Sequence, residues 1–444
     1  MTIAYCTNDA IKKNVDNIRQ AINSGPNKHQ AYDKLAYIVD TFGPRMWAQP
    51  SMALAVDYLY NQIRNWDATK SGLVEVRLEE LDEISTWVRE SEQLILKSPR
   101  KRPQKLGMIG LGNIKDGEVV VVRNWSELDE KGKANKIQGK IVCYNVAWTT
   151  YDDLKFYRQQ GPDRASAYGA IAVLLRSVAS FSIYSPHTGN VRYSGTFTKI
   201  PAAAITVEDA EMLQRMQDRG QKITVDLELN NKMMPSKSHN IIAEIKGSKY
   251  PDQIILMGGH FDSWDTGSQT GAMDDGAGTL VTLEALKVVA DLGIQPLRTL
   301  RWIAWSGEEM GLPNNGNQHY AKYHGDEDHV VALENDVGQL TAIGFGFSGK
   351  LQTSRMVRQL IMNYIPELSV LLMLDLELYK TLGDKGVPLM RNIYKDPNDD
   401  YYFKYHHSAG DTMNILNPDE MDSNVFAISS MMYIIADNPE RLPK

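Results

Sequence analysis

The sequence predicts an α/β protein with more than one domain, because of its length and of two changes in its pattern. A chain of 444 residues is too long for one small core and suggests roughly two or three domains. Helical periodicity gives way to short apolar runs near residue 103, and from about residue 240 strand-like and helix-like segments alternate. Such alternation is typical of a sheet with helices on both faces.

The composition is that of an ordinary globular protein and excludes several kinds of partner. Hydrophobic residues make up 43% of the chain and charged residues 23%, and a net charge of −7 argues against nucleic acid. No apolar run approaches the ~20 residues that span a bilayer. The first residues have neither the basic nor the apolar region of a signal peptide, so none is expected. Cys6 and Cys143 have no CxxC spacing, which excludes a zinc–thiolate site.

Residues 1–103 are predicted to be the helical start of the main domain. Apolar residues recur at helical spacing in two runs, which are Ala31, Leu35, Ile38 and Phe42, then Val56, Leu59 and Ile63. Gly43-Pro44 separates the two helices. A basic cluster between Pro99 and Pro103 is predicted to be a solvated linker.

Residues 104–232 are predicted to form a separate α/β unit inserted into the first. Short apolar runs typical of strands occur at residues 118–122, 140–144, 170–175, 201–205 and 223–227. Helical stretches lie between them at residues 125–131 and 210–219.

Residues 233–444 are predicted to be the catalytic domain. Strands are expected at residues 241–245, 254–257 and 298–305, and a helix at residues 276–291. Polar motifs follow these strands directly. Open α/β sheets place their active sites at the carboxyl ends of the strands, so we expect the motifs to meet there.

Five metal-capable residues mark this region, and they are His260, Asp274, Glu309, Asp336 and His407. Two imidazoles and three carboxylates suit a pair of zinc ions (Zn²⁺) with one bridging carboxylate. This set of residues is typical of a two-metal hydrolase.

The neighbours of these residues suggest further roles. Glu308 precedes a candidate ligand and is free to act as a general base. Asp262, two residues after His260, can accept the second N–H of that imidazole and fix its tautomer. Asp274 and Asp275 can also be read as a helix N-cap, and one can bind metal while the other caps. Of His406 and His407, only one can face a given site.

The remaining histidines lack carboxylate neighbours in the sequence and are predicted to lie on the surface; they are His29, His187, His239, His319, His324 and His329.

The order His-x-Asp, Asp-Asp-Gly, Glu-Glu, Asp, His resembles the co-catalytic di-zinc aminopeptidase family, and within it the carboxypeptidase Q subfamily. The segments that carry the resemblance are residues 177–189, 200–202, 205–212, 247–251, 260–265, 271–275 and 406–413. The resemblance implies a phosphorylase-like α/β/α catalytic domain with a protease-associated-like insert as a cap. It also implies a cis peptide bond between Asp274 and Asp275.

The resemblance further implies how the ligands are shared. His260 and Asp336 would hold one zinc ion, Glu309 and His407 the other, and Asp274 would bridge them. Members of the subfamily are secreted or lysosomal homodimers that cleave dipeptides with unblocked ends. The polar segment 177–189 is then placed to cap the cleft.

Charged chain ends buried under a cap need partners, and Arg176, Tyr184 and His187 are candidate partners for the substrate carboxylate.

Three departures from the family pattern bear on the substrate rather than the metals. Two residues are inserted around 268–270, residues 45–49 replace a small-residue turn, and residues 374–380 replace a Gly-rich stretch. Two rival functions stay open. One is a non-catalytic binding homologue, although no ligand position is substituted. The other is a glutaminyl-cyclase-like acyltransferase, which uses a single zinc ion.

Overall fold

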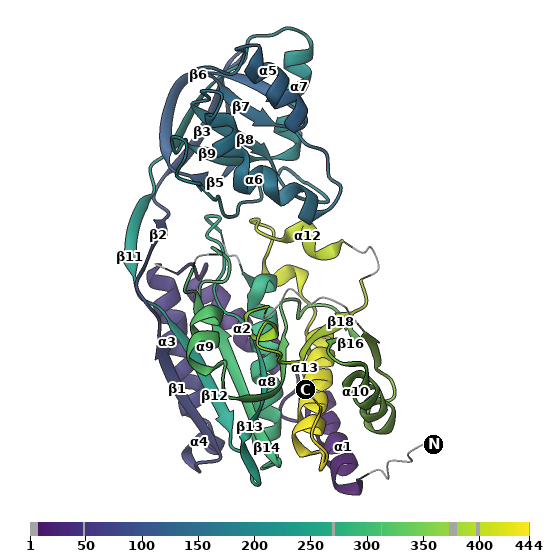
Figure 1. Cartoon of the computed structure of the whole chain (residues 1–444). Coiled ribbons are helices and arrows are strands. Elements are labelled where there is room, and N and C mark those ends of the chain that lie inside the picture. The colour runs from purple at the N-terminus through teal and green to yellow at the C-terminus, as the bar shows by residue number, and fades with distance from the viewer. Residues whose placement is uncertain are drawn as a thin grey trace.

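The computed structural model describes residues 8–47, 49–268, 271–311, 313–372, 380–396 and 400–443. Two lobes are visible in Figure 1, each built around its own eight-stranded sheet. A two-stranded ribbon of β2 (Ile84–Val88) and β11 (Lys232–Ser236) runs between them. Cys6, residues 269–270 and residues 374–379 lie outside the described residues.

The main lobe contains the sheet of order β1-β12-β14-β13-β15-β18-β16-β17. Its strands are β1 (Val74–Glu80), β12 (His239–Ile245), β13 (Tyr250–His260), β14 (Arg298–Trp305), β15 (Asp328–Glu334), β16 (Ala342–Ser348), β17 (Ser369–Leu372) and β18 (Leu389–Tyr394). At its centre β14, β13, β15 and β18 are parallel. Every residue of β14 is buried, as expected for a central strand with helices on both faces.

Helices cover both faces of this sheet, as predicted. One face packs against α1 (Asp9–Asn23), α2 (Gln30–Phe42), α3 (Pro50–Arg64), α8 (Gly278–Asp291), α10 (Leu351–Tyr364) and α13 (Pro418–Asp437). The other packs against α9 (Gly316–His324) and α11 (Lys380–Gly383). Short helices α4 (Asp67–Lys70), α12 (Tyr401–Tyr405) and η2 (Met413–Ile415) complete the lobe. Successive side chains of β13 point into opposite cores, since Ile255 packs in the cluster that contains α8 and Leu256 in the one that contains α9.

The insert lobe contains the sheet of order β4-β3-β10-β6-β7-β8-β9-β5. Its strands are β3 (Glu92–Ser98), β4 (Arg102–Gln104), β5 (Leu106–Gly110), β6 (Gly112–Val122), β7 (Ile141–Tyr144), β8 (Ala172–Arg176), β9 (Ala202–Ile205) and β10 (Thr224–Leu229). Helices α5 (Trp125–Lys133) and α6 (Tyr151–Ser166) cover one face, and α7 (Val207–Asp218) covers the other. The strand and helix positions expected for residues 118–227 are confirmed. The domain division at residues 103 and 232 stays a prediction.

Two predictions for the first hundred residues are wrong. The helices end at Lys70, and strands β1 to β3 occupy residues 74–98. The basic segment is not a linker, because Arg102–Gln104 pairs with β3 and the Arg102 guanidinium forms an ion pair with Asp209. Apolar spacing alone did not reveal these strands, since β1 has polar side chains at most positions.

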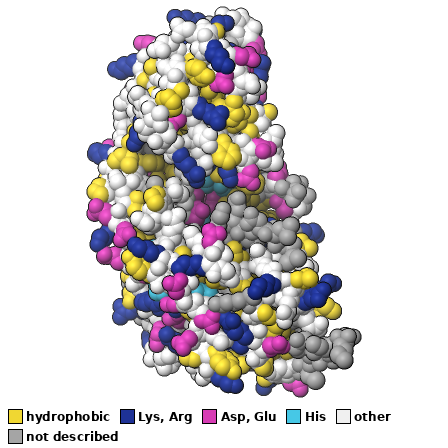
Figure 2. Space-filling view, viewed as in Figure 1, with side chains coloured by type: hydrophobic (Ala, Val, Ile, Leu, Met, Phe, Trp, Pro, Cys, Tyr) yellow, Lys and Arg dark blue, Asp and Glu magenta, His cyan; other side chains and the backbone are white. Residues whose placement is uncertain are grey.

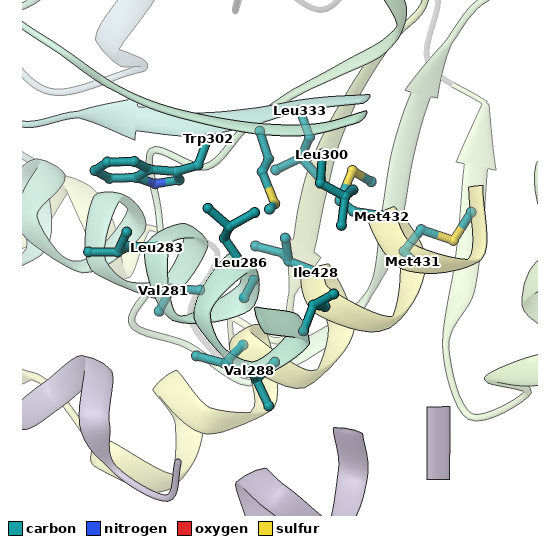
Figure 3. Close-up of a cluster of buried hydrophobic side chains, with 14 of the residues drawn as sticks. Val281, Leu283, Leu286, Val288, Leu300, Trp302, Leu333, Ile428, Met431 and Met432 are labelled. Atoms are coloured by element: carbon teal, nitrogen blue, oxygen red, sulfur yellow. The ribbon is translucent and has the colours of Figure 1, made fainter. Parts of the chain in front are cut away.

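Helix α8 packs against both the sheet and α13, and it follows η1 (Ala272–Ala277), the segment that contains the candidate ligand Asp274. In Figure 3, Leu286 points toward Leu300 and Ile428. Met432 from α13 and Trp302 from β14 belong to the same buried cluster. Among the described residues, no helix combines the length and apolarity needed to cross a bilayer.

We predict that Leu286→Ala lowers the free energy of unfolding by about 2–5 kcal/mol, since it leaves a cavity in a core that is fully buried at this position. Urea unfolding followed by circular dichroism measures the change. The control is Leu292→Ala at the end of the same helix, where the side chain is 37% exposed. Equal losses for both variants would contradict the assignment of α8 as the central packing helix.

Candidate metal centre

Three of the candidate ligands follow neighbouring parallel strands. His260 is the last residue of β13, Glu309 follows β14, and Asp336 follows β15. Asp274 lies in η1 (Ala272–Ala277), the turn that leads into α8, and His407 follows α12. The sheet therefore brings the first three together, and two connecting segments add the others.

The two carboxylate oxygens of Asp274 face different histidines. Its Oδ1 lies 3.2 Å from His260 Nε2, and its Oδ2 lies 3.5 Å from His407 Nε2. His260 Nε2 is also 3.2 Å from Asp336 Oδ1, and His407 Nε2 is 2.8 Å from Glu309 Oε2. The five residues thus form two pairs, with the carboxylate of Asp274 between them.

The chemistry of this cluster fits bound cations. Asp274 Oδ2 is buried and has no hydrogen-bond partner among the described residues. Burial and nearby carboxylates raise the pKa of Glu308 to about 7 and the pKa of Glu309 well above its usual range. Crowded buried carboxylates are costly unless a positive charge neutralises them. Nitrogen and carboxylate oxygen donors in this number are those zinc prefers.

The imidazoles are prepared to present Nε2. Burial lowers the pKa of His407 well below its usual range, which favours the neutral form that binds metal. The Nδ1 of His407 lies 3.2 Å from the main-chain oxygen of Thr188 in the insert lobe. The Nδ1 of His260 lies 3.1 Å from the main-chain oxygen of Asp262. An N–H on each Nδ1 donates to these oxygens and leaves Nε2 free.

Asp262 holds the Glu308-Glu309 pair as well as His260. Its Oδ1 accepts a hydrogen bond from the Glu308 N–H and its Oδ2 one from the Glu309 N–H, both at 3.2 Å. Its Oδ1 lies 3.7 Å from His260 Nδ1, farther than the main-chain oxygen. The residue predicted to orient the imidazole therefore contacts it mainly through its backbone, and its carboxylate fixes the turn after β14.

Asp275 takes the capping role that was expected of one of the two aspartates. Its Oδ1 accepts a hydrogen bond from the Gly278 N–H at 2.9 Å, at the start of α8. Its Oδ2 accepts one from the His260 N–H at 3.1 Å. The peptide bond between Asp274 and Asp275 is cis, which confirms that prediction.

Two buried residues that the sequence did not reveal as part of the site hold the turn before α8. Asp411 accepts hydrogen bonds from the main-chain N–H groups of Met273 at 2.6 Å and Asp274 at 3.2 Å. Arg45 donates to the main-chain oxygens of Phe261 and Gly271, each at 2.7 Å. Burial lowers the pKa of Arg45 to about 10. The sequence offered one signal for Arg45, since it belongs to residues 45–49, which depart from the family pattern.

The insert lobe contacts the segment that carries His407. His187 and Ser408 form an isolated β-bridge, and the Thr188 N–H donates to the His407 oxygen at 2.9 Å. The aromatic rings of Tyr151 and Phe403 stack across the lobes with centroids 5.2 Å apart. The backbone of one lobe thus positions a candidate ligand of the other.

A cavity of about 540 Å³ lies between the lobes over the candidate ligands. In Figure 2 a hollow between the lobes exposes acidic and histidine side chains. The insert lobe lines the cavity with Thr150, Tyr151, Asp152, Lys155, Arg158, Gln159, Asn190 and Arg192, and the main lobe lines it with His260, Asp274, Glu308, Glu309, Gly311, Asp336, Tyr402, Phe403, His406 and His407. Both His406 and His407 line it, so the expectation that only one of them can face the site is wrong.

Arg176, Tyr184 and His187, the candidate partners for a substrate carboxylate, are not among the described residues that line this cavity. Arg176 pairs with Glu211 at 2.5 Å, and the Tyr184 hydroxyl lies 2.6 Å from Arg102. His187 is buried, and its Nδ1 lies 2.6 Å from the His406 main-chain oxygen. In the structure, each of these three side chains therefore contacts another group of the protein.

The prediction of surface positions is wrong for His187, His319 and His329, which are buried. For His329 the reason is its place in the central strand β15, where its Nε2 contacts the Tyr320 hydroxyl.

Comparison with known proteins identifies the family of the chain. Residues 240–432 match peptidase family M28. Carboxypeptidase Q from Bos taurus is 37% identical over 95% of this chain and 88% of its own, and that from Homo sapiens is 36% identical over 99% and 95%.

Among solved structures, a peptidase M28 precursor from Shewanella amazonensis is 26% identical with a TM-score of 0.86, over 98% of this chain and 99% of its own. A zinc aminopeptidase from Bacillus subtilis, at 20% identity and a TM-score of 0.66 over 94% and 97%, shares the fold. The resemblance seen in the sequence is confirmed. The chain belongs to peptidase family M28 and is a metallo-exopeptidase of the carboxypeptidase Q kind.

Proposed function

We propose that the protein binds two zinc ions and hydrolyses unblocked dipeptides. His260 and Asp336 would hold one ion, Glu309 and His407 the other, and Asp274 would bridge them. The observation that supports this most is the carboxylate of Asp274, whose two oxygens face the two imidazoles at 3.2 and 3.5 Å. A ligand set of this size exceeds what one tetrahedral zinc ion and a water molecule need.

Zinc ions bound here would supply Lewis acidity and lower the pKa of a coordinated water toward ~7. Glu308 lines the cavity beside the candidate ligands, and it is the proposed general base. Its carboxylate would accept the proton of the attacking water and deliver it to the leaving amine. Asp262 accepts a hydrogen bond from the Glu308 N–H and so fixes the backbone that carries the Glu308 side chain.

The insert lobe is the proposed limit on substrate length. It lines one side of the cavity with polar side chains, and a volume of about 540 Å³ suits a small ligand. A single-zinc acyltransferase or a non-catalytic binding protein is disfavoured, because all five candidate ligand positions carry metal-capable residues that lie together. From the family resemblance we also propose that the protein is a secreted or lysosomal homodimer.

We predict that Glu308→Gln abolishes peptidase activity and leaves zinc content unchanged. The amide keeps the size of the side chain and removes its basicity, and loss of a general base costs about 10²–10⁴-fold in kcat. Dipeptide hydrolysis and metal analysis on the same preparation measure both. The matched control is Glu309→Gln at the adjacent candidate ligand, which should lower zinc content as well. Near-normal turnover in Glu308→Gln would show that another residue is the base.

We predict that free dipeptides are cleaved faster than N-acetylated dipeptides and pentapeptides, since the insert lobe closes over the site. A panel of all three classes, assayed by amino-acid release, gives the ranking. Equal rates on blocked or longer peptides would mean that the insert lobe does not limit length, and the enzyme would then be a broader aminopeptidase or an endopeptidase.

A further inference from the structure

The described residues that line the cavity include three cations, and they differ in how their charge is balanced. Lys155 pairs with Asp152 at 2.5 Å, so its charge already has a partner. Arg192 is exposed, so its charge is accessible to water. Arg158 is 3% exposed, and neither of its hydrogen bonds goes to a carboxylate.

The guanidinium of Arg158 is held in place by neutral groups. Its Nη1 donates to the Thr188 oxygen at 3.1 Å, and its Nη2 donates to the Tyr151 hydroxyl at 2.7 Å. Its Nε is buried and has no hydrogen-bond partner in the part of the chain that the structure describes. Gly189, at φ +147°, allows the close packing, because a Cβ there would lie 2.3 Å from the Arg158 Cζ.

The surroundings of Arg158 favour an anion. A buried charge without a counter-ion costs several kcal/mol. His406, which lines the same cavity, supplies no negative charge and so does not offset that of Arg158. A planar guanidinium matches a carboxylate through two parallel hydrogen bonds.

We propose that Arg158 binds the free C-terminal carboxylate of the substrate. This inference rests on the proposed dipeptidase function and adds a specificity-determining residue to it. Every unblocked dipeptide carries this carboxylate whatever its side chains, and Arg158 lines the same cavity as the candidate zinc ligands. Binding the carboxylate would give the buried guanidinium its missing counter-ion, and a substrate without it would leave the guanidinium unpaired.

The test compares the best-cleaved dipeptide with its C-terminal amide, in the wild-type enzyme and in Arg158→Met. The wild-type enzyme should prefer the free acid. In the variant, kcat/KM for the free acid should fall by roughly 10- to 100-fold, while that for the amide changes by less than about threefold. The loss should lie mainly in KM. Arg158→Lys, which keeps the charge, should restore part of the preference.

The matched control is Arg164→Met on the same helix, where the side chain stacks on Trp125 and does not line the cavity. It should keep the wild-type preference for the free acid. Zinc content and melting temperature are measured for each variant. They show whether loss of the hydrogen bond from Arg158 to Thr188 disturbs the candidate ligand His407 or the fold.

Loss of activity on acid and amide alike, with loss of zinc, would overturn the proposal and make Arg158 a clamp for the Thr188 contact to His407. Equal wild-type rates on acid and amide would overturn it too.

If Arg158→Met does not fold, inhibition of the wild-type enzyme by product analogues tests the proposal. A free amino acid should inhibit at least about tenfold more strongly than its amide, and equal inhibition would refute the proposal. Rapid cleavage of N-acetylated or longer peptides would instead refute the dipeptidase function, and the comparison of acid with amide would still test Arg158.

Discussion

The candidate metal centre depends on one buried carboxylate, that of Asp274, which has an imidazole on each side. Its backbone is held by Asp411, which accepts hydrogen bonds from the N–H groups of Met273 and Asp274. Its neighbour Asp275 fixes both the start of α8 and the end of β13. Because α8 is packed into the main core, the position of this carboxylate follows from the folding of the whole lobe.

The second constraint comes from the insert lobe. The main-chain oxygen of Thr188 contacts the Nδ1 of His407 and also accepts a hydrogen bond from Arg158. One carbonyl thus connects a candidate zinc ligand to the proposed carboxylate-binding residue. Metal binding and substrate binding would therefore share a structural element, and the relative position of the two lobes would affect both.

Much of the fold and the ligand cluster could be predicted from the sequence, because parallel strands end at the same edge of a sheet. His260 ends an apolar strand, and Glu309 and Asp336 follow two others, so the strand positions alone were enough to predict that the three lie close together. Thr188 and Arg158 could not be predicted, since they act through a main-chain oxygen and through burial at a contact between lobes. Strands β1 to β3 were missed because their polar side chains hide the alternation. Arg176 was favoured as a carboxylate partner, but its counter-ion Glu211 lies one turn along a helix whose packing the sequence does not reveal.

Anomalous X-ray diffraction at the zinc absorption edge, from crystals of the zinc-loaded protein, tests the central role of Asp274 most directly. Two anomalous peaks roughly 3.5–4 Å apart, one beside His260 and Asp336 and the other beside Glu309 and His407, with one oxygen of Asp274 bound to each, would agree with it. A single peak in fully active protein, or two peaks with Asp274 bound to only one of them, would contradict it.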